Sequence, residues 1–286
     1  MDFIKKTKIV ATLGPATSSE DTIEKMILGG VNVFRVNFSH ADYNNVSDRI
    51  KMIRKVDVKL NTNTAIMGDL QGPKLRIGEI KEGSYLKSGD RVIFSTEKPF
   101  IGNSKKAYMN YKNFPKDVSK GERILLDDGK LIFEVISTNK KHEVEAKVIQ
   151  GGDFKSKKGV NLPNTNISLP ALTEKDIQDA EYMFTQDIDW IALSFVRFSQ
   201  DIIDLKNLMA KHIDIKIPII AKIEKPEAIE NIDKIIAYSD GLMVARGDLG
   251  VEIPAQEVPL IQKRLVRLAK KSRIPIIIAT QMMETM

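Results

Sequence analysis

The hydrophobic and polar positions of the chain form short apolar runs that alternate with longer amphipathic stretches. Short runs rich in β-branched residues are typical of buried strands, and the stretches between them have the period of helices. The pattern predicts strands at 7–13, 31–37, 64–69, 190–195, 217–223, 241–246 and 274–280. It predicts helices at 43–59, 173–185, 199–211, 226–237 and 257–271, and another that begins after Ser18 or Ser19. This alternation indicates βα units and a parallel sheet.

The alternation of predicted strands and helices stops between residue 71 and roughly residue 169. Apolar and polar residues alternate singly there between glycine-containing turns, and Asp128-Gly129 predicts a hairpin. We expect a small all-β domain at 72–169, inserted between barrel parts at 1–71 and 170–286. An insertion at this point would overhang the C-terminal face of the barrel and act as a lid.

Polar side chains stand at the ends of two predicted strands. Arg35, Asn37 and Ser39 occupy alternate positions, and Lys222 and Glu224 repeat this spacing. Residues two apart share one face of a strand, and in a closed parallel barrel that face is the interior. Because barrel interiors are otherwise filled with branched apolar side chains, polar residues at strand ends usually serve chemistry. The sequence therefore predicts an active site.

Composition narrows the class of protein. With 286 residues, 42% of them hydrophobic, the chain can bury a substantial core. It lacks both an apolar stretch of about 18 residues and the apolar region of a signal peptide, which predicts a cytoplasmic protein with no membrane partner. The absence of cysteine excludes disulfides, thiolate catalysis and zinc-thiolate sites. The spacing of His40, His142 and His212 argues against a histidine metal site.

The net charge of +6 raises the question of a nucleic-acid partner. Aromatic residues make up only 6% of the chain, and the basic residues are scattered through amphipathic stretches. The densest basic clusters, at 5–8 and 155–158, read most simply as solvated surfaces. We therefore expect no nucleic acid, and a small anionic substrate fits the charge as well.

Six local sequences together resemble, in order, the signature segments of pyruvate kinases. They are TKIVATLGPAT (7–17), RVNFSH (35–40), DLQGPKLR (69–76), AKIE (221–224), ARGDLGVEI (245–253) and ATQM (279–282). The resemblance covers essentially the whole chain. It implies an α/β fold, a (β/α)8 TIM-type barrel truncated after strand 7, with an inserted small all-β barrel domain and no C-terminal domain. It also implies that the full-length protein is a homotetramer.

The resemblance implies a reaction as well. In that family, phosphoenolpyruvate donates its phosphoryl group to ADP in glycolysis, which gives ATP and an enolate that is protonated to pyruvate. Such chemistry asks the protein mainly for positioning and charge neutralisation. By resemblance, Glu224 and Asp248 hold Mg²⁺ or Mn²⁺ in a partly solvated site. Lys222 would stabilise the transferring phosphoryl group and the enolate oxygen, and Arg35 would bind the phosphate.

Further roles follow from the same resemblance. Backbone N–H groups of Gly247 and Asp248 would bind the substrate carboxylate, because glycine lets the backbone approach closely. The Thr280 hydroxyl would contact the same carboxylate and take part in proton transfer; alternatively, Thr280 caps the next helix. Arg246 would orient its loop or an interface.

The nucleotide site matches the family less completely. Asn37, His40 and Arg76 correspond to positions near the ADP phosphates, with His40 in a supporting role. Many relatives carry a lysine directly after F-V-R, where this chain has Phe198. A phenyl ring cannot neutralise phosphate, so that contact is lost or supplied by another residue.

The last expectation concerns the need for a monovalent cation. Many pyruvate kinases use K⁺ and have Thr after the strand-ending Asp, with Glu four residues beyond that Thr. The corresponding positions here are Leu70 and Lys74, which resemble the branch that works without K⁺. The ammonium of Lys74 would replace the ion, unless it points to solvent at the hinge. If K⁺ did bind, its region would comprise Asn37, Ser39, Asp69 and Leu70.

Two other functions stay open at this point. One is an Mg²⁺-dependent lyase or aldolase that acts on a pyruvate enolate, which the inserted domain and the RVNFS segment disfavour. The other is an inactive binding fragment, because an unclosed barrel would hold substrates poorly. We expect the isolated chain to be at best weakly active.

Overall fold

The computed structural model describes residues 6–163 and 165–280, except the side chain of His40. Its largest sheet has seven strands in the order β1-β2-β3-β12-β13-β14-β15, and each neighbouring pair is parallel. The strands are β1 (Ile9–Thr12), β2 (Val31–Asn37), β3 (Ala65–Asp69), β12 (Trp190–Leu193), β13 (Ile219–Ile223), β14 (Gly241–Ala245) and β15 (Ile276–Ala279). Each lies within a strand predicted from the apolar runs, so the parallel sheet is confirmed.

Helices connect these strands. They are α1 (Glu20–Leu28), α2 (Tyr43–Leu60), α4 (Glu174–Phe184), α5 (Ser199–His212), α6 (Pro226–Glu230), α7 (Ile232–Tyr238), α8 (Arg246–Glu252) and α9 (Val258–Lys271), with 3-10 turns η1 (Pro15–Thr17), η2 (Phe38–His40) and η3 (Ala255–Glu257). The side chain of Ser19 caps α1 by accepting a hydrogen bond from the N–H of Thr22 at 3.2 Å. The predicted helix at 226–237 is two helices that meet at Asn231.

Helix α8 corrects one expectation from the sequence. The segment that contains Arg246, Gly247 and Asp248 was expected to be a loop, but these residues form the first turn of a seven-residue helix. A helix this short, with two glycines, has too few apolar positions to show a helical period. Gly247 and Asp248 therefore lie at a helix N-terminus.

The parallel sheet is curled, with one apolar layer on each face. Helices cover the outer layer, which includes Phe34, Ile66 and Val244. The inner layer is built around Met67, Ala192, Ile220 and Met243, and residues of both edge strands, β1 and β15, pack against it. Since the two edges share one inner cluster, the sheet bends round toward closure. Every residue of β13 and β14 is buried, whereas β1 and β15 are partly exposed, as expected for edges.

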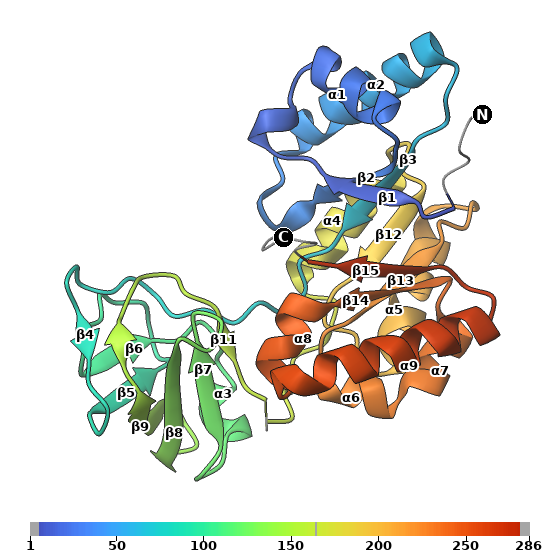
Figure 1. Cartoon of the computed structure of the whole chain (residues 1–286). Coiled ribbons are helices and arrows are strands. Elements are labelled where there is room, and N and C mark those ends of the chain that lie inside the picture. The colour runs from blue at the N-terminus through green and yellow to red at the C-terminus, as the bar shows by residue number, and fades with distance from the viewer. Residues whose placement is uncertain (1–5, 164, 281–286) are drawn as a thin grey trace.

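Between β3 and α4 the chain forms a separate β-rich unit, which we call the inserted segment (Figure 1). Six strands pair in the order β11-β7-β8-β9-β5-β6, and β10 pairs with β4. Their bounds are β4 (Tyr85–Leu86), β5 (Arg91–Ser95), β6 (Lys106–Tyr108), β7 (Arg123–Leu126), β8 (Leu131–Thr138), β9 (Glu143–Gln150), β10 (Gly152–Asp153) and β11 (Val160–Asn161). The segment has its own apolar core, which includes Phe94, Phe114 and Phe133.

Two details of the inserted segment differ from a purely antiparallel β unit. It contains a short helix, α3 (Phe114–Asp117), and β5 pairs with β6 in parallel. The predicted hairpin is present between β7 and β8, and Asp128 and Gly129 both have positive φ, of 57° and 83°. In the part of the chain that the structure describes, no helix is both long and apolar enough to cross a membrane.

Candidate functional site

A cavity of about 450 Å³ opens at the ends of the parallel strands. Most of its polar lining comes from residues that the sequence singled out. The polar and glycine residues of its wall are Thr12, Arg35, Lys222, Glu224, Gly247, Asp248 and Thr280. These residues come from β1, β2, the end of β13, the start of α8 and the end of β15. The curl of the sheet therefore gathers side chains that lie up to 268 positions apart, from 12 to 280.

Lys222 is at the centre of an ion network. Its Nζ donates to Ser194 Oγ at 2.6 Å and lies 3.1 Å from Glu224 Oε1 and 3.2 Å from Asp69 Oδ1. Burial acts to lower the pKa of Lys222, but the charges of Glu224 and Asp69 outweigh it and raise that pKa above its ordinary value. The side chain is therefore an ammonium held between two carboxylates.

Asp69 joins the two cations of the cavity. Nε and Nη2 of Arg35 both lie 2.5 Å from Asp69 Oδ2, and Nη1 of Arg35 donates to Thr12 Oγ1 at 3.0 Å. The Asp69 side chain is only 1% exposed. Because the same carboxylate also contacts Lys222, it fixes the guanidinium and the ammonium side by side. Two adjacent, oriented cations suit a phosphate group.

The two carboxylates matched to metal ligands differ in their surroundings. Glu224 is 1% exposed and accepts a hydrogen bond from the N–H of Phe195 at 2.8 Å. Burial raises its pKa, while the charge of Lys222 opposes that rise. Asp248 is half-buried in the first turn of α8. The expectation of a partly solvated site thus holds for Asp248 and is wrong for Glu224.

The described residues contain no group of three or more His, Cys, Asp or Glu side chains that could by itself hold a metal ion. Glu224 and Asp248 line one cavity and offer oxygen ligands only. Such a donor set fits Mg²⁺ or Mn²⁺, which keep waters and accept substrate oxygens as the remaining ligands.

Other predicted site residues lie elsewhere. Asn37 is exposed, and its side chain accepts a hydrogen bond from the N–H of Ser39 at 3.0 Å, which caps η2. Neither residue lines the cavity. Arg76 lies in the inserted segment, where its Nη1 donates to the carbonyl of Lys157 at 2.9 Å. The side chain of His40 lies outside the described residues.

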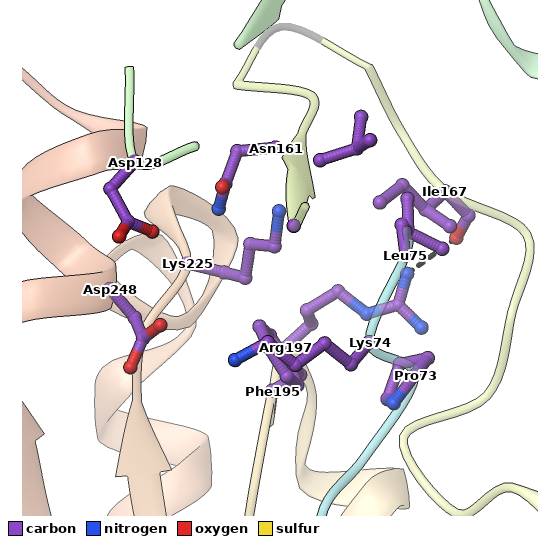
Figure 2. Close-up of a pocket in the computed structure, with 12 residues that line it drawn as sticks. Pro73, Lys74, Leu75, Asp128, Asn161, Ile167, Phe195, Arg197, Lys225 and Asp248 are labelled. Atoms are coloured by element: carbon purple, nitrogen blue, oxygen red, sulfur yellow. Dashed lines mark hydrogen bonds between the residues drawn. The ribbon is translucent and has the colours of Figure 1, made fainter. Parts of the chain in front are cut away.

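A second, smaller cavity of about 40 Å³ lies between the inserted segment and the parallel sheet (Figure 2). Lys74 is exposed and lines it, together with Asp248 and Asp128. Leu70 is 1% exposed and belongs to the apolar core, so it presents no polar group to a cation. Phe198 is 40% exposed, and the guanidinium of Arg197 lies 5.9 Å from its ring centroid.

The sequence did not single out Ser194 and Glu252, which accept hydrogen bonds from the cavity-lining residues Lys222 and Lys225. Ser194 follows β12 and could have been found by the same strand-end rule that identified Lys222. Glu252 has no such signal, because it ends a helix that was not predicted. Arg246, expected to orient its part of the chain, donates from Nε to the carbonyl of Ala279 at 3.0 Å and joins α8 to β15.

Comparison with known proteins identifies the family to which this chain belongs. A family model described as "Pyruvate kinase, barrel domain" matches residues 4–286. The chain belongs to the pyruvate kinase family. It is 45% identical over 285 residues to a pyruvate kinase of Bacillus licheniformis. The aligned region covers 99% of this chain and 48% of that protein. A pyruvate kinase of Corynebacterium efficiens is 42% identical over 282 residues, which is 99% of this chain and 59% of that protein.

A pyruvate kinase of Geobacillus stearothermophilus is similar to the same extent, with 44% identity over 284 residues. The chain thus spans about half the length of these pyruvate kinase relatives. The resemblance seen in the six short segments extends through the intervening sequence, so membership of the pyruvate kinase family is confirmed.

Proposed function

We propose that the protein is a pyruvate kinase, a phosphotransferase that moves the phosphoryl group of phosphoenolpyruvate to ADP. The observation that carries the proposal is the ammonium of Lys222, which lies 3.1 Å from Glu224 and 3.2 Å from Asp69 in the cavity that Arg35 and Asp248 also line. A fixed cation beside oxygen ligands for a metal is what a developing enolate and a transferring phosphoryl group require.

The divalent cation would be held by Glu224 and Asp248. When bound, Mg²⁺ or Mn²⁺ would neutralise charge on the substrate oxygens. Lys222 would stabilise the negative charge that grows on the enolate oxygen as the phosphoryl group leaves. Arg35 would bind the phosphate with its planar fork, which Asp69 holds in place through two contacts of 2.5 Å.

The substrate carboxylate would lie against the first turn of α8. The backbone N–H groups of Gly247 and Asp248 and the hydroxyl of Thr280 would donate to it. A Cβ at position 247 would lie 3.1 Å from Thr280 Oγ1, so glycine leaves room for this hydroxyl. Thr280 would then also take part in moving a proton to the enolate.

The nucleotide would approach from the side of the inserted segment, with Asn37, His40 and Arg76 near its phosphates. Arg76 belongs to the inserted segment and does not line the large cavity. Movement of the segment as a lid would bring it closer. In the same proposal, residues 72–169 are a separate lid domain between barrel parts at 1–71 and 170–286.

The finer features of the family complete the proposal. The fold would be a (β/α)8 barrel of which this chain carries seven strands, in a cytoplasmic, glycolytic homotetramer that binds no nucleic acid. K⁺ would not be required, because Lys74 supplies a positive charge and Leu70 offers no side-chain oxygen.

Phosphorus NMR tests the proposal. With phosphoenolpyruvate, ADP and Mg²⁺ present, the phosphoenolpyruvate signal should fall as the signals of ATP rise by the same amount. Release of inorganic phosphate instead, or loss of phosphoenolpyruvate without ADP, would favour a lyase or hydrolase and contradict phosphoryl transfer.

A further inference from the structure

One carboxylate oxygen joins the inserted segment to two elements of the parallel-sheet body. Nδ2 of Asn161, the last residue of β11, donates to Oε1 of Glu252 at 2.7 Å. Nζ of Lys225 donates to the same oxygen at 2.6 Å. Figure 2 shows the amino group of Lys225 pointing toward Asn161. Three segments far apart in the sequence therefore meet at the last residue of α8.

This contact is buried and incompletely satisfied. Glu252 is 5% exposed and Lys225 is 6% exposed, so solvent screens the ion pair little. Oε2 of Glu252 is buried and has no hydrogen-bond partner in the described part of the chain. A buried carboxylate oxygen without a partner is unfavourable, and water would relieve it if the segments separated. The contact thus combines a buried ion pair with one unsatisfied oxygen, and the unsatisfied oxygen lowers the cost of separating the segments.

Among the described residues, the other hydrogen bonds between the inserted segment and the rest of the chain lie at its two linkers. At the outgoing linker, the N–H of Gly72 donates to Asp176 Oδ1 at 3.0 Å. At the returning linker, the guanidinium of Arg197 donates to the carbonyls of Ile167 and Leu169. Within residues 6–163 and 165–280, no ion pair connects the inserted segment to the rest of the chain. Rotation about the linkers would therefore break the Asn161 contact and keep the hydrogen bonds at both linkers.

We propose that Glu252 is a latch that holds the inserted segment in its observed position through Asn161 and couples that position to the candidate metal carboxylates. Lys225 directly follows Glu224, and Glu252 lies one helical turn beyond Asp248 in α8. Displacement of Glu252 would therefore also displace Glu224 and Asp248. The latch itself is independent of the reaction, whereas the coupling rests on the proposed function.

Spin-label distances test the latch without any assay of activity. The 286 residues contain no cysteine, so Lys98→Cys in the inserted segment and Lys234→Cys in α7 give two unique labels at exposed positions. The doubly labelled protein without further changes, called the parent, should show mainly one distance. Asn161→Ala should raise the population at other distances, relative to this one, about tenfold, as expected for losing a hydrogen bond to a charged group. Asn161→Asp should raise it further, because two carboxylates would then face each other.

Gln150→Ala is the matched control. Gln150 also donates through its amide, but to the carbonyl of Lys130 within the inserted segment, at 3.0 Å. The spin-label distances in Gln150→Ala should equal those in the parent. Unchanged distances in both Asn161 variants would overturn the latch, as would an equal shift in Gln150→Ala.

Mn²⁺ binding, followed by electron paramagnetic resonance, tests the coupling. Asn161→Ala should weaken Mn²⁺ binding several-fold relative to Gln150→Ala, because Glu224 and Asp248 lose their common support. Equal affinity would overturn the coupling. If the parent bound no Mn²⁺ at all, the metal assignment and the coupling would both fail, while the distances would still decide the latch.

Discussion

The ammonium of Lys222 lies 3.1 Å from Oε1 of Glu224, two residues further along the chain. Both side chains are nearly inaccessible, at 10% and 1% exposure, so water screens their attraction weakly. A divalent cation bound to Glu224 would share that carboxylate with Lys222. The lysine would then be placed beside the metal, at the point where negative charge develops in the proposed reaction.

Removal of the charge of Glu224 or Asp248, the two proposed metal ligands, should nearly abolish turnover. Glu224→Gln keeps an oxygen to accept the N–H of Phe195, and Asp248→Asn alters a half-buried side chain, so both variants should fold. Initial rates of pyruvate formation and urea unfolding curves would check this, with the exposed Glu230→Gln as the control. Near-normal turnover of either variant at ordinary Mg²⁺ concentrations would show that the ligand assignment is wrong.

Gly247→Ala should weaken substrate binding. The new Cβ would lie 3.1 Å from Thr280 Oγ1, which is too close for the hydroxyl to keep its position. KM for phosphoenolpyruvate should rise about tenfold, as expected for the loss of one hydrogen bond to a charged group. Gly250→Ala is the control in the same helix, because its Cβ would meet Val258 at an ordinary 3.6 Å. Equal KM values for the two variants would contradict the carboxylate site at α8.

Tyr111 should make stability sensitive to alkaline pH. Burial, together with its hydrogen bond to Asp117, raises the pKa of Tyr111 from 10.0 to about 12. The folded state therefore keeps a proton that the unfolded state loses, so this stabilisation is complete below pH 10 and is lost as pH rises toward 12.

Urea unfolding at several pH values would measure this contribution. The stability difference between the parent and Tyr111→Phe should shrink between pH 10 and pH 12. The exposed Tyr238→Phe provides the control, and its difference from the parent should stay constant. A Tyr111→Phe difference that does not change with pH would disprove the role of this hydroxyl.

Lys74 should make the full-length enzyme independent of K⁺. Turnover should proceed in a buffer whose only monovalent cation is bulky and non-coordinating, and Lys74→Glu should create a K⁺ requirement by reversing the local charge. Lys81→Glu makes the same charge change at another exposed position of the inserted segment and should create none. Strong activation of the unmodified enzyme by K⁺ would refute the proposal and return Asn37, Ser39 and Asp69 to the role of ligands.

Local pattern was sufficient to predict the seven strands, because each is a short apolar run and most of them are flanked by amphipathic helices. It also pointed to Lys222 and Glu224, which line the large cavity, since polar side chains at the ends of apolar strands stand out from the sequence around them. The direction of Asn37 could not be predicted, because η2 begins directly after it and its side chain caps that turn instead of continuing the strand alternation. The period of two applies only while the strand lasts.

Contacts between distant segments were beyond local pattern. Lys222 and Asp69 are 153 residues apart, and only the strand order β3-β12-β13 brings them together. The same holds for Asn161 and Glu252, which are 91 residues apart and lie in elements of two different units. Helix α8 was also missed, because a seven-residue helix with two glycines has too few apolar positions to show a helical period.

Phosphoryl transfer to ADP is tested by measuring pyruvate formation with each reactant omitted in turn. We predict that pyruvate appears only when phosphoenolpyruvate, ADP and a divalent cation are all present, and that Glu224→Gln reduces the rate to background. Pyruvate formed without ADP, or at the same rate by Glu224→Gln, would contradict this prediction.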